Sequence, residues 1–90
     1  MEVKLIEIVR NLASFGGENT IYASEPWNPD CEAIVVPARE SNAVEGARMK
    51  YFLEVFVARD FLDDWTVSLE KPPTLQERCA RLIHYAIHDA

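Results

Sequence analysis

The sequence lacks a cluster of basic residues and lacks a long run of apolar ones. Its 15 acidic side chains outnumber the nine Lys and Arg, and the net charge is −6. Because binding to nucleic acid depends on Lys and Arg that neutralise phosphates, we expect no nucleic-acid partner. No stretch approaches the roughly 20 apolar residues that a membrane-spanning helix needs, so we expect no membrane partner either. An acidic surface suits a basic protein partner.

Cysteine is scarce, since only Cys31 and Cys79 occur and they lie far apart. The chain starts without the apolar run of a signal peptide, so we expect a cytoplasmic protein with both thiols reduced. Cys79 falls on an apolar helix stripe, where a thiol packs as a small hydrophobe instead of acting as a nucleophile. We therefore predict no catalytic residue and no cofactor, and we favour a non-enzymatic protein over an enzyme.

The apolar content is high enough for a folded core. Hydrophobic residues make up 49% of the 90 residues, which predicts one domain over 1–90. A chain this short buries a smaller fraction of its surface than a longer one, so we expect marginal stability unless the core is well packed or shared with another subunit.

The clearest local signal is the start of a helix near the C-terminal end. Thr74 and Glu77 have the spacing of a capping box, and Pro72 and Pro73 hold the chain before it extended. Apolar residues then recur at helical spacing, which predicts a helix over 75–88 with one buried face. The residues of that face are Leu75, Cys79, Leu82, Ile83, Ala86 and Ile87.

Two further helices are predicted from the same periodicity. Residues 2–13 form a short amphipathic helix that ends at Gly16 and Gly17. Another helix begins near Ala58, and acidic residues in its first turns complement the helix dipole. Its apolar stripe consists of Ala58, Phe61, Leu62, Trp65 and Leu69.

Three strands are predicted, over 20–23, 33–36 and 50–57. The second is apolar on both faces, which favours a central position in a sheet. The third could also be read as a helix, but a strand accounts for more of its apolar residues, and it would place Phe52 and Phe56 on one face. A polar loop over 38–46 precedes it.

Together these elements predict an α+β fold in the order α-β-β-β-α-α. Short connections favour a small three-stranded antiparallel sheet with the helices packed on one face. Phe52 and Phe56 would lie on the opposite face, so we expect them to form the interface of a homodimer.

Three sets of polar and aromatic residues are candidates for a site. Trp27 lies in a Pro-rich turn, and a ligand groove is predicted where it meets Tyr22, Tyr85 and His84. The acidic residues Asp60, Asp63 and Asp64 are predicted to bind a partner, although the alternative is a solvated helix start. His84 and His88 are four residues apart and could share a metal, but two imidazoles do not complete a site, so no metal site is predicted.

Residues 20–90 contain a series of short patterns: Ile21-Tyr22, Glu25-x-Trp27-Asn28, Ile34-Val35-Val36, Lys71-Pro72 with Leu75, Arg81 and Tyr85, and His88-Asp89-Ala90. Together these patterns resemble a family of small, uncharacterised bacterial proteins classed as a domain of unknown function. The order and spacing of the patterns carry this resemblance. It implies no established activity and no catalytic residue, and such proteins are similar in type to those on mobile gene cassettes and beside toxin genes.

The sequence thus predicts a cytoplasmic interaction protein that self-associates, with an accessory or immunity-type role. The acidic charge would match a basic partner without any chemistry. The alternative is a small-ligand binder or modest enzyme with a pocket near Trp27, Tyr22 and Tyr85.

Overall fold

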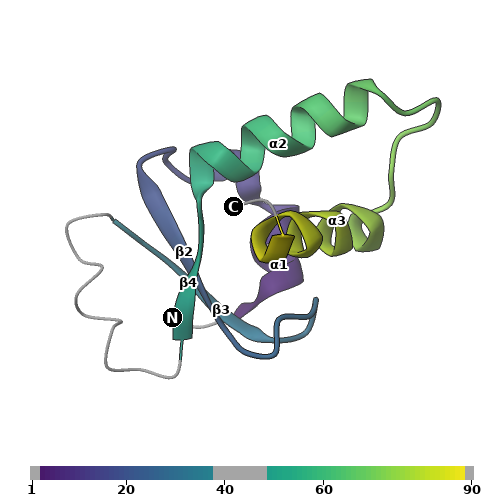
Figure 1. Cartoon of the computed structure of the whole chain (residues 1–90). Coiled ribbons are helices and arrows are strands. Elements are labelled where there is room, and N and C mark those ends of the chain that lie inside the picture. Colours follow the sequence, from purple (N-terminus) through teal and green to yellow (C-terminus); the bar gives the residue numbers. More distant parts are fainter. Residues whose placement is uncertain (1–2, 38–48, 89–90) are drawn as a thin grey trace.

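The structure is a computed structural model that describes residues 3–37 and 49–88. Three helices and a sheet are arranged around one core, and α2 extends away from the sheet toward the segment that leads into α3 (Figure 1). In chain order the elements are β1 (Val3–Lys4), α1 (Leu5–Arg10), a 3-10 turn η1 (Leu12–Ser14), β2 (Asn19–Ser24), β3 (Glu32–Pro37), β4 (Met49–Glu54), α2 (Val55–Val67) and α3 (Leu75–His88).

The sheet is antiparallel, and its strands lie in the order β1-β3-β2-β4. The α+β class and the antiparallel sheet are confirmed, but the described residues contain four strands where three were predicted. The additional strand, β1, has two residues, which pair with Ala33 and Glu32 of β3. Two residues are too few to give a periodicity, so the sequence could not distinguish β1 from the start of a helix.

The first predicted helix, over 2–13, is shorter than expected. The α-helix covers Leu5–Arg10, and Leu12–Ser14 continue as a 3-10 turn. The side chains that made the helical spacing, Leu5, Ile8, Val9 and Leu12, are nevertheless all buried. The spacing therefore identified the buried face correctly, while the backbone ends of the helix were wrong. The predicted loop over 38–46 lies outside the described residues.

The third predicted strand is wrong at its C-terminal end and in the direction of its side chains. β4 ends at Glu54, and Val55 already belongs to α2. The pairing with β2 shifts by one residue, because Ile21 pairs with Leu53 while Tyr22 pairs with Tyr51. Such a bulge leaves one residue, Phe52, without a partner and interrupts the alternation of faces.

The bulge overturns the predicted homodimer interface of Phe52 and Phe56. Phe52 is 1% exposed and belongs to the core, whereas Phe56 is 48% exposed and belongs to α2. The two rings therefore share no sheet face. The sheet face that points away from the core instead carries Tyr22 and Tyr51, whose rings meet edge-on at 6.2 Å.

One hydrophobic core joins the sheet and all three helices. Ile21 and Leu53 contribute from the sheet, and the helices contribute apolar side chains at helical spacing. None of the helices within the described residues has the length and apolar character needed to cross a membrane. The buried helix residues are Leu5, Ile8 and Val9 of α1, Val55, Ala58 and Leu62 of α2, and Cys79, Leu82 and Ile83 of α3.

The capping box predicted for the last helix is confirmed. The Thr74 amide donates to a Glu77 carboxylate oxygen at 2.8 Å, and the Glu77 amide donates to the Thr74 hydroxyl at 3.1 Å. Two of the amide groups that a helix start leaves unpaired are thereby satisfied. One member of the predicted apolar face, Ile87, is 56% exposed.

Candidate functional site

The helix α2 is held firmly at its N-terminal end. It follows β4 with no residue between them, and the Phe56 amide donates to the carbonyl oxygen of Gly17 at 3.2 Å. A Cβ atom at Gly17 would lie 3.3 Å from the Phe56 Cβ, so glycine permits this close approach. Arg59 adds a second tie, because its guanidinium donates to the carbonyl oxygen of Phe15.

The solvent side of α2 carries an acidic ridge, which consists of Phe56, Asp60 and Asp64. These residues are four apart and therefore form one i, i+4 row on the helix surface. Both carboxylates are exposed, and the Phe56 ring is half exposed. Neither ridge carboxylate takes part in an ion pair within the described residues. The ion pairs found there join Lys4 to Asp30 and Arg10 to Glu7.

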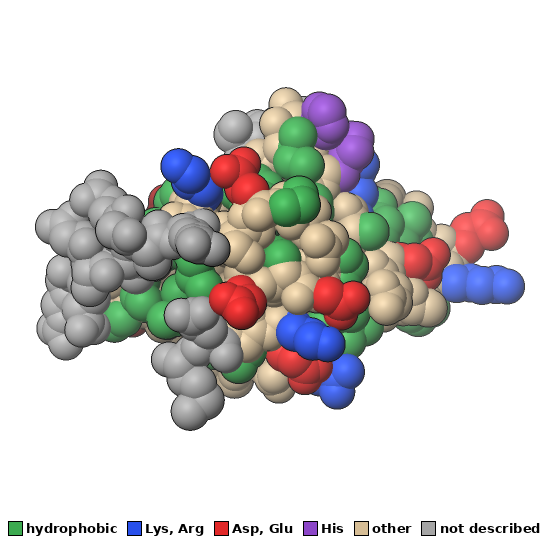
Figure 2. Space-filling model, turned by 90° about the horizontal axis from the view of Figure 1, so that it is seen from below, with side chains coloured by type: hydrophobic (Ala, Val, Ile, Leu, Met, Phe, Trp, Pro, Cys, Tyr) green, Lys and Arg blue, Asp and Glu red, His purple; other side chains and the backbone are tan. Residues whose placement is uncertain are grey.

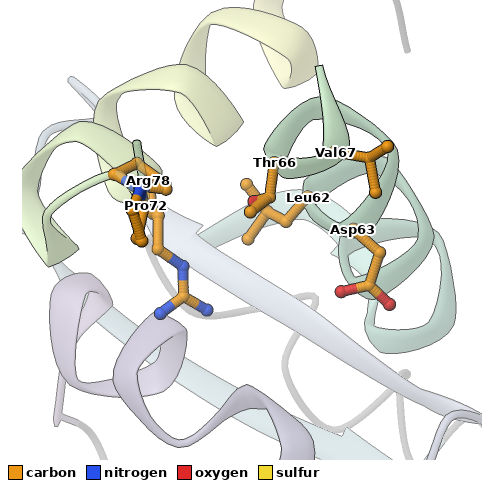
Figure 3. A pocket seen from close by; sticks show the side chains of 7 residues that line it. Leu62, Asp63, Thr66, Val67, Pro72 and Arg78 are labelled. Carbon is orange, nitrogen blue, oxygen red and sulfur yellow. The ribbon is translucent and has the colours of Figure 1, made fainter. Parts of the chain in front are cut away.

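An arrangement of this kind can bind a basic surface. The carboxylates attract Lys or Arg, while an aromatic ring beside them offers apolar area and a face for a cation. The third predicted acid, Asp63, does not belong to the ridge. It lines a groove of about 470 Å³ between α2 and α3, with Arg78 on the other wall (Figure 3).

The predicted ligand residues Trp27, Tyr22, Tyr85 and His84 are not brought together. Trp27 is half buried, its indole N–H donates to the carbonyl oxygen of Ala23 at 3.1 Å, and its ring meets Phe52 edge-on at 4.9 Å. These contacts anchor the Pro-rich turn onto the core. Tyr22 lies on the outer face of the sheet.

Tyr85 and His84 belong to a cluster that joins α2 to α3. Tyr85 stacks on Phe61 with 4.2 Å between ring centroids, and the Arg81 guanidinium lies 5.5 Å from the Phe61 ring. Arg81 Nη1 is also 3.4 Å from His84 Nδ1. Stacking and cation–π contacts of this kind stabilise helix packing, which accounts for the placement of Tyr85.

His84 and His88 lie side by side on the surface of α3, as Figure 2 shows. Their ring centroids are 4.5 Å apart. Within residues 3–37 and 49–88, no group of three or more potential metal-ligating side chains is found. Both imidazoles lie in the C-terminal half of α3.

A groove does exist beside Trp27, but its other residues differ from the predicted ones. It has a volume of about 500 Å³ and is lined by Glu25, Pro26, Trp27, Ala86 and Ile87. The sequence signal for this groove is the apolar residue Ile87 at the end of the predicted helix face, which the structure leaves exposed. Glu25 is the one charged residue in its lining.

Both cysteines are buried and free. Burial, together with the smaller effect of negative charge on Cys31 and Asp30, raises the pKa of the Cys79 thiol to about 11. The thiol is therefore protonated at neutral pH, whereas a reactive cysteine needs the thiolate. This agrees with the role of Cys79 as a small core residue.

Comparison of the chain with protein-family models, with curated proteins and with solved structures found no match. The resemblance to a family of small bacterial proteins therefore stays a prediction from the sequence patterns. The function must be argued from the surface of the molecule itself.

Proposed function

We propose that the chain is a cytoplasmic protein-interaction domain without catalytic activity, which self-associates and binds a basic protein through the acidic ridge of α2. An accessory or immunity-type role fits this activity, because blocking a basic surface requires complementary charge and no chemistry.

The observation that carries the proposal is the composition of the ridge. Phe56, Asp60 and Asp64 combine a half-exposed aromatic ring with two exposed carboxylates in one row. Binding energy at protein interfaces concentrates in a few large side chains, of which aromatics are the most frequent. The charges steer a basic partner toward the surface, and the net charge of −6 acts in the same direction.

The small-ligand alternative has less support from the geometry. It required Trp27, Tyr22, Tyr85 and His84 at one pocket. In the structure Trp27 lies in the turn before β3, Tyr22 lies on the outer sheet face, and both Tyr85 and His84 lie on α3. The polar atom of Trp27 is already used by Ala23. The groove beside Trp27 thus offers a ligand one carboxylate and apolar surface.

The proposal is tested by affinity capture from a native lysate with three forms of the full chain. We expect the wild-type chain to capture a basic protein, and Asp64→Lys to weaken that complex about tenfold, because a repulsive charge then faces the partner. Glu70→Lys is the matched control, since it makes the same charge change at an exposed position outside the ridge.

Two further measurements sharpen the result. Phe56→Ala should also weaken the complex, and added salt should weaken it for the wild-type chain because the ion pairs are exposed. A captured protein that binds the Asp64→Lys and Glu70→Lys variants equally well would remove the ridge from the proposal. Capture of no basic protein would refute the function itself.

A further inference from the structure

The groove between α2 and α3 has an apolar centre and one charge of each sign. Leu62, Asp63 and Val67 line it from α2, and Arg78 lines it from α3, with Pro72 beside it (Figure 3). Pro73 also contributes to the lining. Val67 is 85% exposed, although a valine gains free energy when it is buried. The groove is therefore an apolar surface that the described part of the chain leaves open.

The two charges lie on opposite walls and have no ionic partner in the described chain. Figure 3 shows Asp63 on α2 and Arg78 on α3, with Leu62 and Thr66 between them. The ion pairs found in residues 3–37 and 49–88 involve other side chains. Arg78 also stands in the first turns of α3, where the helix dipole disfavours a cation and favours an anion beside it.

We propose that this groove is the surface through which two copies of the chain associate about a two-fold axis, each Asp63 pairing with the partner subunit's Arg78. In a two-fold interface one patch meets a copy of itself, so the patch must carry both members of every contact. A patch with one anion, one cation and apolar surface between them meets that condition.

Other occupants fit the groove less well. A basic protein would bring a cation toward Arg78, and an acidic one would bring an anion toward Asp63. A second copy satisfies both charges and covers Val67 with the apolar surface around the partner subunit's Pro72. The inference rests on the self-association in the proposed function and assigns residues to it. Asp60 and Asp64 of the acidic ridge are not part of the groove lining.

A charge swap tests the interface, with light scattering on the full chain over a range of concentrations. We expect the wild-type chain to reach twice its monomer mass of 10.3 kDa. Asp63→Arg and Arg78→Asp should each raise the dimer dissociation constant about a hundredfold, because each places like charges together at two symmetric contacts. The double variant D63R/R78D should recover the wild-type dimer.

Two more variants show whether the effect is specific to the groove. Glu18→Arg makes the same charge change at an exposed position in the turn before β2, away from the groove, and should leave the mass unaltered. Val67→Lys alters a side chain that is 85% exposed, so it should dissociate the dimer while the circular dichroism spectrum stays that of the wild type.

The outcomes also separate this inference from the proposed function. A wild-type chain that is monomeric at every concentration would refute both the interface and self-association. A dimer that is insensitive to the Asp63 and Arg78 substitutions, or a double variant no better than the single ones, would refute the interface alone. An intact dimer that captures no basic partner would contradict the proposed binding of a basic protein and would still support the interface.

Discussion

At the scale of single residues, the two phenylalanines that flank Glu54 show how one bulge redistributes side chains. Strict alternation along β4 would place Phe52 and Phe56 together. The shift of pairing between Ile21 and Tyr22 turns Phe52 into the core, and the start of α2 turns Phe56 outward. A β-bulge has no reliable sequence signature at a position like this one, so neither change could be read from the residues alone.

Substitution of each phenylalanine by alanine separates the two environments. We expect Phe52→Ala to lower the free energy of unfolding by about 3–5 kcal/mol, because it leaves a cavity against Trp27. Phe56→Ala should cost less than about 1 kcal/mol, since its ring is half exposed. Urea unfolding followed by circular dichroism measures both. Equal losses would contradict the placement of these rings.

The buried thiol of Cys79 predicts a loss of stability at alkaline pH. The folded thiol has a pKa of about 11, against 9.0 for an unperturbed thiol, so only the unfolded chain releases the proton between these values. The contribution of Cys79 is fully present below pH 9 and falls by about 2 kcal/mol as the pH rises to 11.

This prediction is checked by urea unfolding at pH 8 and pH 10.5 on the wild-type chain and on Cys79→Ala. Other groups titrate in the same interval, so the difference between the two chains is the informative quantity. The variant should be less stable at pH 8 and should lose less stability on going to pH 10.5. Identical pH dependence in both chains would show that the thiol titrates normally in the folded state.

At the scale of elements, α3 is the part of the fold that local sequence determines most fully. Its start depends on the reciprocal hydrogen bonds between Thr74 and Glu77, which are three residues apart. Contacts of this range do not depend on the rest of the molecule. The sequence accordingly predicted a helix from near 75 to about 88 and its capping box, and the structure has both.

Removal of the cap should shift the whole unfolding transition. We expect Thr74→Ala to lower the free energy of unfolding by about 1 kcal/mol, the usual cost of losing an N-cap side chain. Gln76→Ala is a suitable control, because Gln76 is an exposed residue inside α3 that lies outside the groove, and alanine has the higher helix propensity. Thermal unfolding of both variants measures the difference. A Thr74→Ala chain as stable as the control would contradict the role of the cap.

The strands were predicted less well than α3, because their limits depend on partners that are distant in sequence. The strands over 20–23 and 33–36 were found as β2 and β3 with one additional residue at each end. β1 exists because Val3 and Lys4 pair with residues about 30 positions later. A pairing of that range is decided by the packing of the whole chain, which local patterns do not report.

At the scale of the whole molecule, the structure divides the predicted acidic group between two surfaces. Sequence spacing placed Asp60, Asp63 and Asp64 together. In the structure, Asp60 and Asp64 lie on the acidic ridge, and Asp63 faces Arg78 across the groove. The sequence could identify the charges. The sequence could not show which carboxylate lies opposite a residue of another helix, because the packing of α2 against α3 decides this.

The four predicted ligand residues were dispersed for the same reason. Trp27, Tyr85 and Tyr22 are each held by an aromatic ring from a different element, namely Phe52, Phe61 and Tyr51. The sequence of a Pro-rich turn does not show whether its aromatic side chain contacts a ligand or packs into the core. The ring that receives it comes from elsewhere in the chain, so only the tertiary structure distinguishes the two cases.

The direct passage from β4 into α2 has a consequence for recognition. Glu54 ends the strand and Val55 begins the helix. Because no linker separates them, the sheet fixes the orientation of α2 from its first turn. The backbone of Phe56 is already held by its hydrogen bond to Gly17 before a partner binds. Binding at Phe56 therefore costs little conformational entropy in α2. Preorganisation of this sort lets a surface of modest area hold its partner without a large entropic penalty.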